Sequence, residues 1–116
     1  MNSTRVVLQV EYNVLANTFA KNDLDNLTPN PSNNVTLQFH ISEEWYRRPI
    51  VVGFVSQLGR EYEPVSALQT AYPSIIRVKV PSSVVSHRKF GVYLVMKTDE
   101  GETIRTNTVF LEQKGG

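Results

Sequence analysis

The sequence predicts an all-β fold, an antiparallel β-sandwich formed by a single domain. Short segments alternate apolar and polar residues, and clusters of turn-forming residues separate these segments. No segment has the periodicity of an amphipathic helix of about ten or more residues. An alternation with a period of two places apolar side chains on one face of a strand, and two packed sheets bury such faces. The length of 116 residues is typical of one domain with one core.

The composition excludes several classes of partner and site. Twelve Lys and Arg against eleven Asp and Glu give a net charge of +1, too small for the positive field that attracts nucleic acid. The absence of cysteine excludes disulfides and thiolate metal sites. The N-terminus has no apolar stretch of signal-peptide length, and no window approaches the roughly 20 apolar residues of a membrane-spanning helix. We therefore expect neither nucleic acid nor membrane as a partner.

The first predicted strand covers residues 4–12, where apolar and polar residues alternate. A long Asn-rich loop follows at residues 13–34; its seven asparagines and two prolines favour turns over a strand. Phe19, Leu24 and Leu27 are scattered through this loop, so we expect it to pack partly against the body of the domain. One short helical turn within the loop is an alternative.

The clearest predicted strand covers residues 35–41, where apolar residues occupy every second position. Trp45 lies in the connection that follows, and Pro49, which cannot donate to a β-ladder, marks the entrance to the next strand. Residues 50–55 are apolar nearly throughout, which is typical of a central strand covered on both faces.

The second half of the chain continues the pattern of strands and turns. After a turn at 57–60 we expect a short edge strand at 61–65 and a polar connection at 66–74. A strand at 76–80 is followed by a helical turn that begins at Pro81. The strongest hairpin signal joins residues 90–96 to 104–110. Residues 113–116 are expected to form a flexible tail.

No residue pattern indicates catalysis, a metal or a cofactor. The sequence contains no G-x-S-x-G motif, no phosphate-binding glycine run and no cysteine nucleophile. His40 and His87 have no further ligand at metal-binding spacing, so two surface histidines are the preferred interpretation. We expect a protein that is not an enzyme.

Trp45, Tyr46, Arg47 and Arg48 form the most evident binding candidate. Aromatic rings beside guanidinium groups can stack on sugars or bases. In the structural alternative, Trp45 caps one open end of the sandwich and the arginines lie on the surface. The residue types alone are compatible with both.

Five short motifs occur in a fixed order along the chain: Trp45 before an apolar strand ending in Gly53-Phe54, then Gly59-x-x-Tyr62, Val78-x-Val80-Pro81-x-x-Val84, Phe90-Gly91-Val92-Tyr93 and Thr106-Asn107-Thr108-Val109. Together, over residues 35–112, they resemble the small Ig-like β-sandwich modules of tailed-bacteriophage virion proteins, of the head-fibre, capsid-decoration and baseplate types. The resemblance implies an Ig-like sandwich of about seven strands and a non-enzymatic structural protein that assembles into the virion in the host cytoplasm. A capsid decoration protein or head-fibre base is the expected role.

The same resemblance implies other virion proteins as partners, either the major capsid protein or adjacent structural subunits. Many copies on a lattice, or a homo-oligomer, would make weak individual contacts sufficient. The residues expected to contact a partner are Phe19, Leu24, Leu27, Trp45, Tyr46, Arg47 and Arg48. The alternative function is a carbohydrate-binding or host-surface-binding module that uses Trp45, Tyr46 and Arg47.

Overall fold

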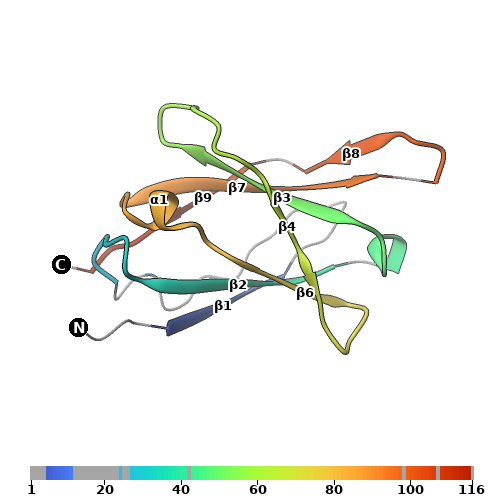
Figure 1. Cartoon of the computed structure of the whole chain (residues 1–116), viewed down its shortest axis with the longest axis horizontal. Helices are drawn as coiled ribbons and strands as arrows, with labels where there is room; N and C mark the ends of the chain where they lie inside the picture. Colours follow the sequence, from blue (N-terminus) through green and yellow to red (C-terminus); the bar gives the residue numbers. More distant parts are fainter. Residues whose placement is uncertain are drawn as a thin grey trace.

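Two β-sheets pack face to face in the computed structural model (Figure 1). The structure describes residues 5–11, 24, 27–41, 43–97, 99–106 and 108–115, with the backbone alone at 5–11 and at Asn34. Sheet A has the strand order β1-β2-β6-β5, and sheet B the order β4-β3-β7-β8, with β9 also paired to β7. The predicted all-β sandwich is therefore confirmed.

Sheet A consists of the first two strands of the chain and a hairpin from the middle of the chain. Its strands are β1 (Arg5–Glu11), β2 (Asn34–His40), β6 (Ile75–Lys79) and β5 (Leu68–Gln69). The β2–β6 and β5–β6 pairs are antiparallel, whereas β1 and β2 are parallel. A parallel pair needs a crossover, because the chain must return to the end of the sheet from which it started. The connection between β1 and β2 fills this role.

Sheet B is built on its longest strand, β7 (Lys89–Lys97), which pairs with β3 (Ile50–Ser56). The short strands are β4 (Val65–Ser66), β8 (Thr103–Arg105) and β9 (Val109–Glu112). The single strand predicted at 104–110 is thus two strands. Thr106 interrupts it: its backbone N–H donates to the Leu94 carbonyl at 3.0 Å, and its Oγ1 accepts from the Leu94 N–H at 3.0 Å.

The chain crosses from sheet B to sheet A between β4 and β5. Of the strand predicted at 61–65, Glu61 forms only an isolated bridge to Val55, and regular pairing begins after Pro64, which lacks an N–H. The segment predicted as a polar connection contains β5. Ala67 lies at the crossing, where its N–H donates to the Ile50 carbonyl at 2.9 Å.

The core lies between the sheets and follows the predicted alternation. Leu37 and Phe39 of β2 and the alternate residues Val52 and Phe54 of β3 are completely buried. A 3-10 turn, η2 (Glu43–Trp45), leads from sheet A to sheet B, and a short helix, α1 (Ser82–Val85), begins after Pro81 as predicted. No described helix is long and apolar enough to cross a membrane.

The C-terminal segment differs from the flexible tail predicted at residues 113–116. Gln113 is completely buried, and the N–H groups of Lys114 and Gly115 donate to the carbonyls of Leu24 and Leu27 at 3.1 and 2.9 Å. These backbone bonds anchor residues 113–115 to the crossover segment, whereas Gly116 lies outside the described residues.

Candidate functional site

The residues predicted to contact a partner lie in different environments. Trp45 is completely buried, and Leu24 and Leu27 also belong to the core cluster. Tyr46 is half-buried, and Phe19 lies outside the described residues. Trp45 therefore closes the end of the sandwich at which η2 lies (Figure 1), as the structural alternative expects. A sugar-stacking surface built on Trp45 is wrong for this structure, because no face of its ring is exposed.

The η2–β3 loop holds Arg47 in an unusual backbone conformation. Its φ of 58° lies in the left-handed region, which is uncommon and strained for residues other than glycine. Its Nη1 donates to the Thr70 carbonyl, directly after β5, at 3.2 Å. The loop is thereby attached to the edge of sheet A.

Arg48 points to the β7–β8 hairpin instead. Its Nη1 and Nη2 donate to the two Asp99 carboxylate oxygens at 2.6 and 3.1 Å, and its Nε donates to the Glu44 carbonyl at 2.9 Å. The hydrogen bond to Arg48, followed by Coulomb attraction, lowers the pKa of Asp99. The Arg48 guanidinium is thus neutralised within the chain.

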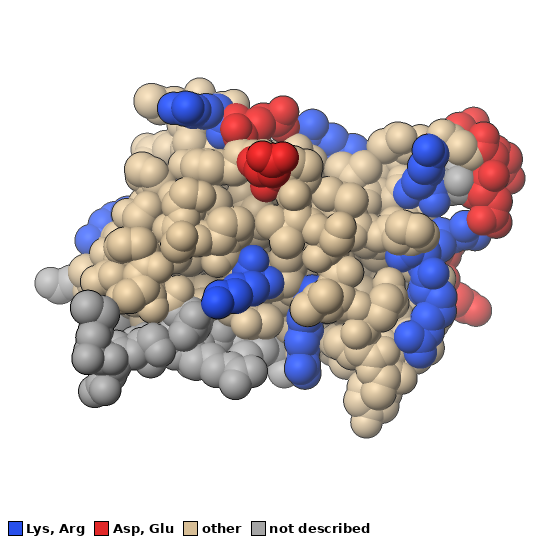
Figure 2. Space-filling view, viewed as in Figure 1, with Lys and Arg blue, Asp and Glu red and all other residues tan. Residues whose placement is uncertain are grey.

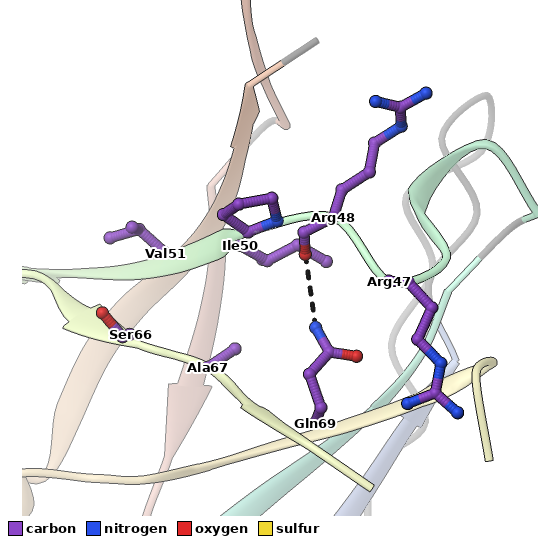
Figure 3. Close-up of a pocket in the computed structure, with 8 residues that line it drawn as sticks. Arg47, Arg48, Ile50, Val51, Ser66, Ala67 and Gln69 are labelled. Atoms are coloured by element: carbon purple, nitrogen blue, oxygen red, sulfur yellow. Dashed lines mark hydrogen bonds between the residues drawn. The ribbon is translucent and has the colours of Figure 1, made fainter. Parts of the chain in front are cut away.

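An open pocket of about 310 Å³ lies between this loop and the β4–β5 crossing. Pro49, Ile50, Val51 and Ala67 supply its apolar wall, and Arg47, Arg48, Ser66 and Gln69 supply its polar groups. Figure 3 shows Arg47 and Arg48 leaving the loop in opposite directions, with the Gln69 amide beneath the Arg48 carbonyl. That amide donates to the carbonyl at 3.2 Å.

The pocket is suited to binding an anionic group. Its lining contains no carboxylate, imidazole or thiol that could act as a general acid, base or nucleophile. Within the described residues, the Arg47 guanidinium donates to a neutral carbonyl, that of Thr70. Arg47 therefore offers a positive charge and further N–H donors at the rim of an apolar pocket.

The histidines do not form a site with each other. His40 ends β2 beside the η2 end of the sandwich, whereas His87 follows α1 at the opposite end (Figure 1). In the described parts of the chain, no group of three or more His, Cys, Asp or Glu residues could hold a metal ion.

Sequence reasoning missed a cluster on the outer face of sheet B. The Tyr93 hydroxyl donates to Glu61 Oε1 at 2.8 Å, and the Arg105 guanidinium lies 3.7 Å above the Tyr93 ring. Burial, followed by the hydrogen bond to Glu61, raises the pKa of Tyr93. The sequence signal is Gly53, a glycine inside a strand, which marks a place where another group approaches closely.

Sequence reasoning also missed two exposed apolar residues in and after β5. Leu68 on β5 and Tyr72 in the β5–β6 loop are each 66% exposed. They lie in the segment predicted as a polar connection, and no sequence pattern marks it as a strand because β5 is only two residues long.

Comparison with solved structures finds a similar fold in a phage protein. No protein-family model and no curated protein sequence matches the chain. The fold is similar to the N-terminal domain of phage TP901-1 ORF48, with a TM-score of 0.59 and 12% sequence identity, over 90% of this chain and 95% of that chain. At this identity the similarity is one of fold. The expected resemblance to a phage module is supported at that level.

Proposed function

We propose that the chain is a structural protein of a bacteriophage particle that binds neighbouring subunits and catalyses no reaction. The observation that carries this proposal is the fold shared with a domain of a phage protein along nearly the whole length of both chains. The chemistry of the pocket is consistent with it, because its lining offers binding groups and no acid–base pair.

Within the particle, we propose the capsid surface as the location, as a decoration protein or the base of a head fibre. Many copies on a symmetric lattice allow each contact to be weak, because simultaneous contacts raise the overall affinity. Of the residues predicted to contact a partner, Tyr46, Arg47 and Arg48 keep at least part of their surface accessible. Leu24, Leu27 and Trp45 instead stabilise the fold.

The direct test is quantitative mass spectrometry of purified particles from the phage that encodes the chain. We expect the chain in a constant ratio to the major capsid protein across gradient fractions. Particles made with a stop codon in the gene provide the background. Absence of the chain from wild-type particles would contradict the proposed function.

Labelling the particles with antibodies to the chain separates capsid from tail. Electron microscopy should show label over the head. Label confined to the tail tip would move the protein to the baseplate and overturn the capsid placement, while the structural role would stand.

A further inference from the structure

We propose that copies of this chain associate head to tail in the particle, with Leu58 of one copy inserted into the pocket between the η2–β3 loop and the β4–β5 crossing of the next copy. The inference rests on the proposed function and deepens it, since it names the contact through which neighbouring copies bind. Three features carry it: an exposed leucine on an ordered turn, an apolar pocket at the other end of the same strand, and opposite charges beside the two.

Leu58 lies at the tip of the turn that follows β3. Its side chain is 96% exposed, the highest value among the exposed large hydrophobic side chains of the described residues. Transfer of such a side chain from water to an apolar environment is favourable. Leu58 can therefore act as an anchor for a partner that offers an apolar pocket.

The turn holds Leu58 in one position. The Ser56 N–H donates to the Arg60 carbonyl at 2.7 Å, and the Ser56 carbonyl accepts from the Gly59 N–H at 3.0 Å. Ser56 Oγ accepts from the N–H groups of Leu58 and Arg60 at 3.3 and 3.0 Å. Gly59 has a φ of 89°, a conformation that glycine adopts without strain. This pre-organisation lowers the entropy cost of binding.

The pocket offers a matching apolar surface. Its wall is apolar, and Arg47 and Arg48 leave the loop in opposite directions (Figure 3). Its volume of about 310 Å³ is near the lower limit of about 300 Å³ for ligand pockets, enough for one apolar side chain. At the rim, Arg47 has further N–H donors that can bind carbonyl groups of the entering turn.

The pocket and the leucine lie at opposite ends of β3. Residues 49–51 line the pocket at the start of the strand, whereas Leu58 follows the last residue of the strand, Ser56. The strand from Val51 to Ser56 is roughly 17 Å long, at about 3.3 Å per residue, so a chain cannot fill its own pocket. Contact between two different surfaces is heterologous, and it repeats from copy to copy to form a ring or a row.

The charges beside the two surfaces are opposite. Arg60 is exposed next to Leu58, whereas Glu43 and Glu44 are exposed on η2, directly before the loop that lines the pocket. None of these three residues forms an ion pair within the described parts of the chain, and Arg47 can balance only one of the two glutamates. In Figure 2, red side chains also gather at the upper right, where the β7–β8 hairpin lies. The pocket end can thus attract Arg60 of another copy, which favours a second copy as the occupant.

Two single-cysteine variants test the contact in assembled particles. Because the chain has no cysteine, Gln57→Cys and Ser66→Cys each create a single attachment point, the first beside Leu58 and the second at the pocket. Both positions are exposed, so we expect unchanged stability. A phage with a stop codon in the gene is supplied with either variant or with an equal mixture of both. The purified particles are then treated with a short bismaleimide.

We expect particles that carry the mixture to yield a dimer of the chain, in which cross-linked peptides join position 57 of one copy to position 66 of the other. Neither variant alone should yield a dimer, because a head-to-tail contact brings two different positions together. The matched control mixes Gln57→Cys with Leu68→Cys. Leu68 precedes the pocket-lining Gln69 on β5 and therefore faces the other side of sheet A, so this mixture should yield no dimer.

Leu58→Ser, added to the Gln57→Cys chain, tests the anchor itself. The turn should persist, because its hydrogen bonds come from the backbone and from Ser56. Urea unfolding should therefore be unchanged. In particles mixed with Ser66→Cys, the dimer yield per incorporated chain should fall by about tenfold, since burial of one leucine changes a binding equilibrium by at least roughly that factor. Leu68→Ser, the same change at an exposed position of β5, should leave the yield unchanged.

Particles that contain both cysteine variants but yield no dimer would overturn the inference and leave the proposed function intact. A dimer from Gln57→Cys alone would show contact between two turns, and an undiminished yield with Leu58→Ser would remove the leucine from the contact. Either result would refute the head-to-tail arrangement. Particles that contain no copy of the chain would overturn the proposed function as well.

Discussion

At the scale of single residues, Tyr93 and Gly53 explain how the outer face of sheet B is covered. The two residues are register partners on β7 and β3, and a Cβ atom at Gly53 would overlap the Tyr93 ring. The ring thus lies across the glycine, where Glu61 and Arg105 hold it. Because Gly53 on β3 has no side chain, the Tyr93 ring on β7 can pack against β3. The ring is therefore buried even though it lies on the outer face of sheet B.

Gly53→Ala should destabilise the protein by about 1–3 kcal/mol, the usual cost of overpacking. The added methyl group would displace the Tyr93 ring and weaken its bond to Glu61. Urea unfolding followed by fluorescence measures the change. In a Tyr93→Ala background the same substitution should cost much less, because the clash is gone. An equal cost in both backgrounds would show that the ring is not responsible.

At the scale of elements, β7 binds two separate strands along one side. β8 pairs with its C-terminal part and β9 with its N-terminal part. Thr106 connects the two by presenting its hydroxyl to the Leu94 N–H, which is buried. The side chain thereby supplies a hydrogen-bond acceptor at the break between the two strands.

Thr106→Val should destabilise the fold by about 1–3 kcal/mol, because a buried N–H loses its acceptor while the side-chain shape is kept. Hydrogen exchange measured by NMR should accelerate at the Leu94 amide. Thr106→Ser retains the hydroxyl and should preserve protection there. Unchanged exchange at Leu94 in Thr106→Val would show that the hydroxyl has no such role.

The β7–β8 hairpin is attached to the η2–β3 loop by the Arg48–Asp99 ion pair. The Asp99 pKa is lowered from 3.8 in the folded state, so the pair stabilises the fold above the unfolded-state pKa. This contribution is lost as the pH falls through the folded-state pKa.

An NMR titration of the Asp99 carboxyl should give a midpoint below 3.8, the usual value for this group. Arg48→Gln should raise that midpoint towards the usual value, because the bidentate cation is removed. Arg60→Gln, which removes an arginine of the turn after β3, should leave it unchanged. The prediction fails if the Arg48→Gln and wild-type midpoints coincide.

At the scale of the whole molecule, Gln113 joins segments that are far apart in the chain. Its Nε2 donates to the carbonyls of Val85 and His87 at 2.8 and 2.9 Å, and its Oε1 accepts from Asn33 Nδ2 at 3.1 Å. Arg88 in turn donates to the Gln113 carbonyl. One buried amide therefore links the end of α1, the segment before β2 and the C-terminal residues.

Gln113→Leu should lower the free energy of unfolding by roughly 2–4 kcal/mol, because the buried Val85 carbonyl and the partly buried His87 carbonyl lose their donor. Urea unfolding provides the measurement. Gln57→Leu, the same change at an exposed turn position, should alter stability by less than about 0.5 kcal/mol. Equal effects of the two substitutions would exclude a structural role for Gln113.

The amino-acid sequence by itself determined most of the long strands and which of their faces are buried. The alternation around Leu37 and Phe39, the apolar run of β3 and the turn after Pro81 all reappear in the structure. These features depend on neighbouring residues only, because a period of two is a property of one strand. The surface arginines of the candidate site, Arg47 and Arg48, were also visible in the sequence as a binding candidate.

Only the tertiary structure decided the parallel pairing of β1, the division of the last strand and the burial of Gln113. It also brought the Arg47 guanidinium to the Thr70 carbonyl and paired Arg48 with Asp99, 51 residues away. The alternation of apolar and polar residues does not specify which two strands pair or whether they run parallel or antiparallel. A hydrogen bond between residues far apart in the chain has no local sequence signal. These contacts form only when the two sheets close on each other.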